Sequence, residues 1–127
     1  MMSDEVRKRY QRGMEAFKKR DFRAAVALLE PITDGKVMES ALARFYAGQG
    51  RHELGLEELK ARRYESAAKH FRRAMDHNPE AGGLARFLAT SYLGMRDFGR
   101  AAQAFSTALE SNPTARDLRI RAAMSLW

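Results

Sequence analysis

Residues 64–79 read YESAAKHFRRAMDHNP, and residues 98–113 read FGRAAQAFSTALESNP, 34 positions later. Each stretch begins with an aromatic residue and ends with Asn-Pro, and each has three alanines and a phenylalanine at the same places between. A fixed period of this length is typical of proteins built from stacked helix-turn-helix units. The sequence therefore predicts an array of helical hairpins, a fold that presents surfaces to partners.

The spacing of the repeated residues indicates helices and how they pack. Ala67, Phe71 and Ala74 follow one another at i, i+4 and i+7, which is the period of a helix. We expect Ala67 to lie where two antiparallel helices cross, because only a small side chain allows a close approach. Phe71 then fills the space between one hairpin and the next. Proline ends each helix, since it lacks the backbone donor that a helix interior needs.

A second repeated feature, Leu54-Gly55, recurs as Leu88-Ala89. With it, the pattern resembles the tetratricopeptide repeat family, which has Leu-Gly on the first helix of each unit and Tyr, Ala, Phe, Ala and Pro on the second. Residues 48–81 and 82–115 match this pattern, with Ala89 in place of the usual glycine. The resemblance implies an all-α fold, a right-handed α-solenoid of antiparallel hairpins.

The N-terminal part carries the same pattern 42 residues before residues 48–81, as in Gly13 and Gly55 or Arg20 and Arg62. We interpret residues 6–39 as a divergent repeat and residues 40–47 as an insertion of eight residues. Pro31 predicts that the second helix of this repeat stops near Glu30, and Thr33-Asp34-Gly35 predicts a turn.

The insertion has two interpretations. Apolar and polar residues keep helical spacing across it, at Met38, Leu42, Phe45, Gln49, His52, Leu56 and Leu59. This spacing favours one long helix over residues 37–61. Against it, Gly48 and Gly50 each cost about 1 kcal/mol relative to alanine in a helix interior, so a break at residues 48–50 remains the alternative.

The chain after Pro113 predicts one more helix, with residues 116–127 capping the last hydrophobic face of the array. Ile120, Met124 and Trp127 form a second apolar stripe on this helix that capping does not use. We expect the stripe to meet a second copy of the chain through a two-fold contact, or segments beyond Trp127 in a longer protein. About three hairpins and this capping helix make one domain over residues 1–127.

Composition argues against several function classes. The chain has no cysteine, which excludes a disulfide framework and a thiolate zinc site, and its apolar runs are too short to span a membrane. The three histidines, His52, His70 and His77, lack ligand spacing and are expected to be solvated. Phosphate-binding loops and nucleophile motifs are missing. We expect a cytoplasmic protein that is not an enzyme and uses no cofactor or metal.

The net charge of +7 is the least expected bulk property. Most of the charges are expected to lie on solvated helix faces, helped by the i, i+4 pairs Glu5–Arg9, Glu15–Lys19 and Glu65–Lys69. A basic surface also attracts acidic partners. Nucleic acid is the alternative partner, which we disfavour because no aromatic stacking motif lies among the arginines. The apolar stripe of the first helix is explained by packing in the array, so no membrane partner is expected.

In tetratricopeptide proteins the first helix of each unit lines a concave groove that receives a partner segment. The resemblance places these residues in the groove: Arg7, Tyr10, Met14, Phe17, Lys18, Gln49, His52, Leu56, Leu59, Lys60, Arg86, Thr90 and Leu93, with Ile120 and Met124 on the last helix. One subfamily clamps a C-terminal carboxylate with asparagines, but Met14, Leu56 and Thr90 stand at those positions here. The groove thus combines apolar and basic residues, which predicts a protein or peptide partner that is amphipathic and acidic.

Overall fold

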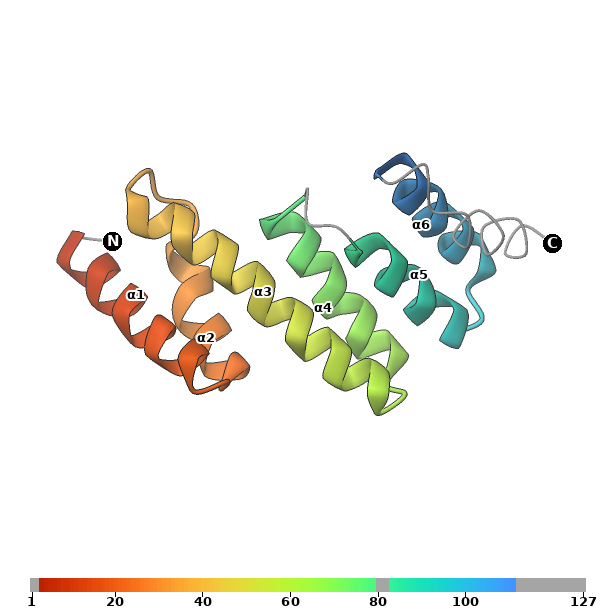
Figure 1. Ribbon diagram of the computed structural model, residues 1–127, viewed down its shortest axis with the longest axis horizontal. Helices are drawn as coiled ribbons and strands as arrows, with labels where there is room; N and C mark the ends of the chain where they lie inside the picture. Colours follow the sequence, from red (N-terminus) through yellow and green to blue (C-terminus); the bar gives the residue numbers. More distant parts are fainter. Residues whose placement is uncertain (1–2, 80–82, 112–127) are drawn as a thin grey trace.

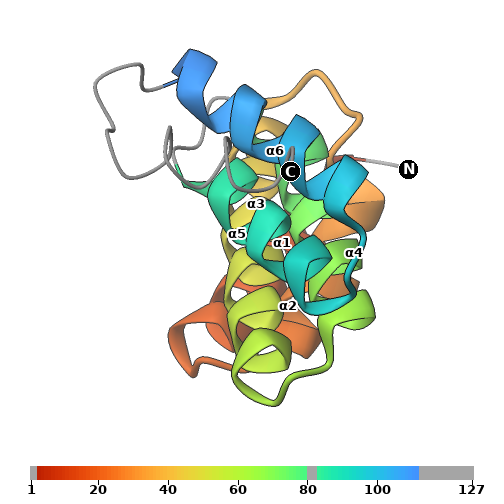
Figure 2. The same cartoon turned by 90° about the vertical axis from the view of Figure 1, so that its right-hand side faces the viewer.

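The computed structural model describes residues 3–79 and 83–111, and helices occupy most of them. In chain order they are α1 (Ser3–Lys18), α2 (Phe22–Leu29), a 3-10 turn η1 (Glu30–Ile32), α3 (Met38–Lys60), α4 (Tyr64–His77), α5 (Leu84–Gly94) and α6 (Phe98–Ser111). Consecutive helices pair as antiparallel hairpins that stand side by side, with α1 and α6 at opposite ends (Figure 1). Seen along the array, the hairpins lie one behind another (Figure 2). The expected all-α solenoid is confirmed.

The turn inside each hairpin has the same backbone conformation three times. Arg20, Arg62 and Arg96 have φ values of 60°, 60° and 61°. These values lie in the left-handed region of the backbone, which residues other than glycine rarely adopt. In each turn the arginine N–H donates to the carbonyl three residues before it, at 2.9, 3.0 and 3.0 Å. These are helix-ending bonds. The turns therefore repeat at the spacings of 42 and 34 residues that the sequence pattern shows.

Helix α3 runs without a break across the inserted residues, so the long helix is the correct alternative. Its two central glycines lie where other segments approach the helix. A Cβ atom on Gly48 would meet the side chain of Asn78 at 2.4 Å, and one on Gly50 would meet Val26 Cγ2 at 2.8 Å. Glycine in a helix interior lowers the stability of the helix, but here it leaves room for α2 and for the end of α4 to approach α3 closely.

Helix α2 ends at Leu29, as Pro31 predicts, and the chain continues into η1. The hydroxyl of Thr33 donates to the Glu30 carbonyl at 3.0 Å, and the Arg44 guanidinium donates to the Thr33 carbonyl at 2.7 Å. These bonds fix the turn against the first part of α3. They leave the Glu30 side chain between α2, α3 and α4.

Two main clusters of buried side chains hold the array together. One joins α4, α5 and α6 around Phe71 and Phe105, and Ala67 and Ala101 are fully buried in it, as the crossing interpretation requires. The other joins α1, α2 and α3 around Leu29. In the described ranges no helix is long and apolar enough to cross a membrane. The predicted capping helix, with Ile120, Met124 and Trp127, lies outside the described residues.

Candidate functional site

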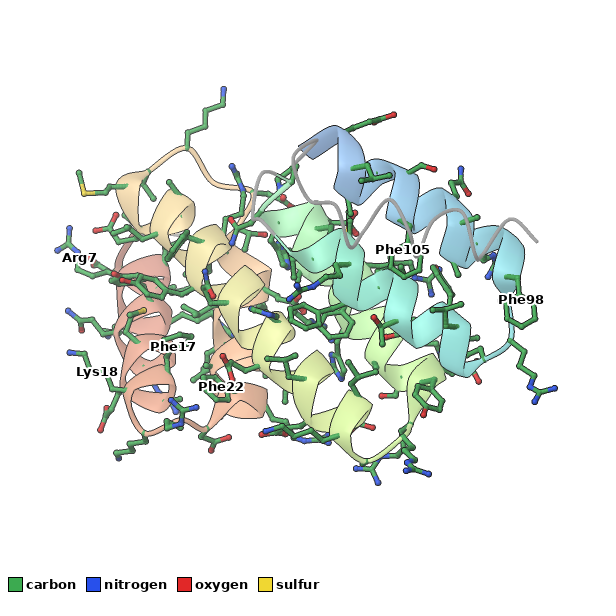
Figure 3. All side chains as sticks on the ribbon, turned by 45° about the vertical axis from the view of Figure 1, so that its right-hand side comes forward. Arg7, Phe17, Lys18, Phe22, Phe98 and Phe105 are labelled. Atoms are coloured by element: carbon green, nitrogen blue, oxygen red, sulfur yellow. The ribbon has the colours of Figure 1, made fainter. Side chains whose placement is uncertain are left out.

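Within the described residues, those predicted to line a groove lie on the first helices of the hairpins, α1, α3 and α5, and Ile120 and Met124 lie outside the described ranges. We call the surface that they share the first-helix face. Its charged members Arg7, Lys18, Lys60 and Arg86 are exposed. Its other members are half-buried, namely Tyr10, Met14, Phe17, Gln49, His52, Leu56, Leu59, Thr90 and Leu93. Arg7 and Lys18 point away from α1 into solvent (Figure 3).

On α1 the predicted residues divide into two groups. Tyr10, Met14 and Lys18 line one shallow hollow of about 330 Å³ together with Gln11 and Glu15, so the structure brings these three together at the surface. Phe17 instead packs edge-on against Phe22 and Tyr46, with ring centroids 5.4 and 5.2 Å apart. Its main role is to join α1 to α2 and α3.

On α3 and α5 several predicted residues also contribute to packing. Leu56, Leu59 and Leu93 pack against the core of α4, α5 and α6. The His52 ring lies 5.5 Å from the Phe87 ring and 6.2 Å from the Phe71 ring. The Nε2 atom of His52 is buried and has no hydrogen-bond partner among the described residues. His52 is therefore not the solvated histidine that the sequence suggested.

The first turns of α3 expose apolar side chains that the sequence reading did not identify as a surface. Met38, Leu42 and Phe45 are 75%, 37% and 47% exposed, and Val37 beside them is 43% exposed. At helical spacing, residues 38, 42 and 45 continue into Gln49, His52 and Leu56 along one side of α3. We call Met38, Leu42 and Phe45 the α3 stripe. The sequence showed the spacing, but nothing in it indicated that no neighbouring helix covers these positions.

A cluster of charged and polar groups joins α2, α3 and α4. The Glu30 carboxylate accepts hydrogen bonds from the Arg51 guanidinium at 2.6 and 2.9 Å and pairs with His77 Nε2 at 2.7 Å. Arg73 Nη2 lies 3.6 Å from Glu30, and Arg51 Nη1 lies 3.1 Å from His70 Nδ1. His70 and His77 are thus partnered side chains inside the array, which corrects the expectation that they are solvated.

The electrostatics of this cluster favour a charged Glu30. Burial by itself would raise the pKa of Glu30, but the hydrogen bonds from His77 and Arg51 and the charges of Arg51 and Arg73 outweigh it and hold this pKa at about 2. Burial, helped by the nearby Arg51 charge, lowers the pKa of His70. The cluster therefore works as an ion pair with neutral His70 beside it.

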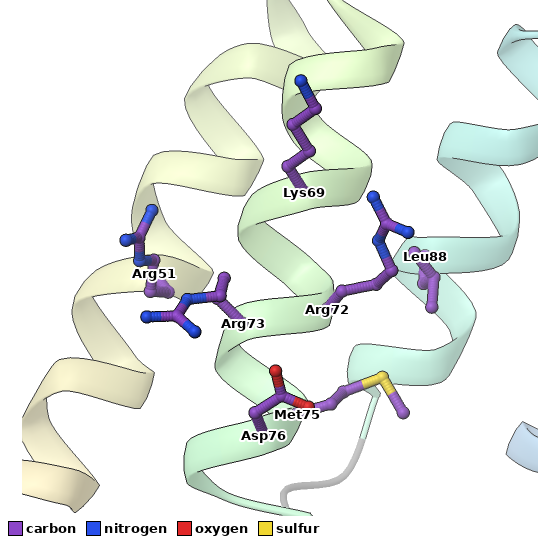
Figure 4. A pocket seen from close by; sticks show the side chains of 7 residues that line it. All are labelled: Arg51, Lys69, Arg72, Arg73, Met75, Asp76 and Leu88. Carbon is purple, nitrogen blue, oxygen red and sulfur yellow. The ribbon is translucent and has the colours of Figure 1, made fainter. Parts of the chain in front are cut away.

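Helix α4 carries a second surface that the sequence reading missed. Lys69, Arg72 and Arg73 lie on its exposed side, and these residues with Arg51, Met75, Asp76 and Leu88 line an open cleft of about 660 Å³ (Figure 4). We call it the α4 cleft. Arg73 points toward Arg51 on α3, whereas Arg72 and Met75 point toward α5. The Arg72-Arg73 pair was visible in the sequence, but its position beside the apolar Leu88 was not.

Few of the surface charges pair as expected. Of the three predicted i, i+4 pairs, Glu15–Lys19 forms at 3.3 Å. In the described part of the chain no ion pair forms between Glu5 and Arg9, or between Glu65 and Lys69; Arg9 donates to the Ala27 carbonyl at 3.4 Å. No group of three or more potential metal ligands occurs within residues 3–79 and 83–111.

Comparison with known proteins settles the family. A family model described as tetratricopeptide repeat matches residues 58–126. The chain belongs to the tetratricopeptide repeat family. This repeat assignment agrees with the three left-handed arginine turns, which recur at the same place in each hairpin. A comparison with curated proteins finds no match.

Three solved structures share this tetratricopeptide fold. A point mutant of MamA is 18% identical over 97% of this chain and 82% of its own, with a TM-score of 0.58. The second TPR domain of human RPAP3, in complex with the HSP70 peptide SGPTIEEVD, is 17% identical over 97% and 96%, with a TM-score of 0.52. The C-terminal TPR-containing domain of a protein described as FK506-binding from Plasmodium falciparum is 14% identical over 97% and 87%, with a TM-score of 0.58.

Proposed function

We propose that this chain is a non-enzymatic scaffold that holds an amphipathic, acidic segment of a partner protein against its first-helix face. The observation that carries the proposal is the exposed α3 stripe, which lies in line with the predicted groove residues of the same helix. Exposed apolar surface of this kind marks interaction sites on soluble proteins. Basic residues at both ends of the array, Arg7 and Arg86, add the charge preference.

Two kinds of energy would contribute to binding. Fully burying a large apolar side chain is worth about 1.5–3 kcal/mol. Met38, Leu42 and Phe45 are already partly covered, so each can contribute a part of this energy when it anchors the apolar side of a segment. Exposed arginine and lysine side chains contribute less to affinity at the rim, but they raise the rate of encounter with an acidic partner. The half-buried members of the face, such as Leu56, form the surface between the α3 stripe and the exposed basic residues.

The RPAP3 domain supports this proposal as an analogy of fold. That domain is solved with a bound peptide that contains two glutamates and a terminal aspartate, so an array of this shape can hold an acidic segment. The identity of 17% carries over no contact residues. The absence of asparagine at Met14, Leu56 and Thr90 argues for different contacts here.

The test is to capture partners from cell lysate on three immobilised proteins, with mass spectrometry of what is retained. The first is the wild type and the second carries Arg7→Glu, Lys18→Glu and Arg86→Glu. The third is a control of equal charge, with Lys8→Glu, Arg12→Glu and Arg23→Glu, which alters exposed cations away from the first-helix face. We expect one set of proteins to be retained by the wild type and the control but lost from the face variant, at low salt and after nuclease treatment.

Two results would contradict the proposal. One is a retained set that the face variant keeps unchanged while circular dichroism shows that it is folded. The other is retention of RNA or DNA with a steep dependence on salt, since release of counterions from phosphates is typical of nucleic-acid binding. That result would favour the alternative function, a helical-repeat protein that binds nucleic acid through its basic surface.

A further inference from the structure

The α4 cleft holds cations that no residue in the described ranges neutralises. Lys69 and Arg72 form no ion pair within the described residues. Glu65 lies one turn before Lys69 and Asp76 lies one turn after Arg72, but neither carboxylate forms an ion pair with these cations. Arg73 and Arg51 differ, because both lie beside Glu30. The unpaired positive charge of the cleft therefore belongs to Lys69 and Arg72.

The arrangement of these cations costs the free protein stability. Lys69 stands at i, i+3 from Arg72, so two like charges without an ion-pair partner among the described residues are neighbours on α4. Like charges at this spacing destabilise a helix. An anion bound between them would remove this repulsion.

The floor of the cleft indicates what the anion is attached to. Met75 is half-buried, and Leu88 is 8% exposed and part of the core of α4, α5 and α6. Arg72 and Met75 both point toward α5, where Leu88 lies (Figure 4). An anionic group that reaches Lys69 and Arg72 thus brings its neighbouring atoms against apolar side chains.

We propose that the α4 cleft binds a phosphorylated serine or threonine in a protein segment, with Lys69 and Arg72 on the phosphate and Met75 and Leu88 against an adjacent apolar side chain. A phosphorylated hydroxyl carries a charge of about −1.5 to −2 and three acceptor oxygens, so it can engage both cations at once. Arg72 offers two parallel N–H donors to such a group, and Lys69 offers a mobile point charge.

The cleft fits a single phosphate better than a nucleic-acid strand. Asp76 lies at its edge, where it would repel the next phosphate of a continuous backbone. The seven residues that line the cleft include no aromatic side chain on which a base could stack. A single phosphate beside an apolar side chain fits both the cations of the cleft and its apolar residues, Met75 and Leu88.

This site is separate from the first-helix face, since most of its lining comes from α4, the second helix of its hairpin. The two proposals can therefore fail independently. The probe is a fluorescein-labelled peptide with phosphoserine next to leucine in degenerate flanks, and the matched control is the same peptide without phosphate. Binding is followed by fluorescence anisotropy at fixed ionic strength.

We expect the phosphopeptide to bind the wild type and a Lys8→Gln/Arg12→Gln control equally, since both of these exposed cations lie away from the first-helix face. With Lys69→Gln/Arg72→Gln it should lose about tenfold in affinity. Met75→Gln, which makes the floor polar without adding a charge, should also weaken binding if the apolar floor takes part. Inorganic phosphate should compete only weakly, because it lacks the apolar neighbour. Circular dichroism confirms that each variant is folded.

The proposal is overturned if the unphosphorylated peptide binds equally well or if the phosphopeptide shows no phosphate-dependent binding. It is also overturned if the Lys8→Gln/Arg12→Gln control loses as much affinity as the cleft variant, since the effect would then reflect net charge alone. Tighter binding of a single-stranded oligothymidylate, with the same dependence on Arg72, would assign the cleft to nucleic acid instead.

Discussion

Glu30 is the single residue on which the junction between the first two hairpins depends most. Its carboxylate joins the end of α2 to Arg51 on α3 and to His77 at the end of α4. Nothing in the sequence indicated this role, because Glu30, Arg51 and His77 follow one another at separations of 21 and 26 positions and belong to no motif. A bond network of this kind becomes visible only when the helices are placed together.

The pKa of Glu30 predicts how this junction responds to acid. The folded-state pKa of about 2 lies below the ordinary value of 4.5, so the charged carboxylate stabilises the folded chain above about pH 4.5. This stabilisation is lost as the pH falls from 4.5 toward 2. We expect Glu30→Gln to lower the free energy of unfolding by about 1–2 kcal/mol at neutral pH, a value reduced for partial contact with solvent.

The measurement is denaturant unfolding of the wild type and Glu30→Gln at a series of pH values. The difference between them should shrink as the pH falls from 4.5 toward 2. His70, whose lowered pKa also weakens the fold in acid below its ordinary value of 6.5, acts in both proteins. Its contribution cancels only in part, because the Glu30 charge offsets some of the lowering of the His70 pKa in the wild type. A difference that stays constant over the whole range would show that Glu30 is not charged and paired as described.

At the scale of the helices, small residues decide how closely the elements approach. Gly55 shows this, because a Cβ atom added to it would lie 2.7 Å from the Phe71 ring. The sequence pattern predicted these contacts well, since a repeated Gly or Ala at a fixed helical position is the direct trace of a close crossing. It predicted the course of α3 less well, because Gly48 reads locally as a helix breaker and its reason lies in Asn78, 30 residues away.

The helix crossings at Ala67 and Ala101 predict which substitutions destabilise the fold. Ala67→Leu and Ala101→Leu should each lower the free energy of unfolding by about 1–3 kcal/mol, because a larger side chain at a fully buried crossing forces the two helices apart. The matched control is Ala41→Leu, on an exposed position of α3, which should change stability by less than about 0.5 kcal/mol. Urea unfolding midpoints provide the comparison. If the Ala67→Leu and Ala101→Leu proteins were as stable as the control, the interpretation that these alanines lie at close helix crossings would be wrong.

At the scale of the whole molecule, the repeat pattern predicted the class of fold and the order of its helices. The 34-residue period and the 42-residue offset both reappear in the arginine turns. The candidate site was predicted only in part. Residue positions on a helix face follow from helical geometry, so Arg7 and Lys18 are exposed as expected. Which apolar positions stay uncovered depends on how far α3 extends past its neighbours, and sequence alone did not show that.

The central claim is that a partner segment lies on the first-helix face, and site-specific photocrosslinking in lysate tests it most directly. A benzophenone side chain is placed at Leu42, in the α3 stripe, or at Met14 on α1, and for comparison at Ala27, an exposed position on α2. The account predicts that positions 42 and 14 crosslink to the same protein and that position 27 does not. Crosslinks from Ala27 alone, or equal crosslinks from all three positions, would contradict it.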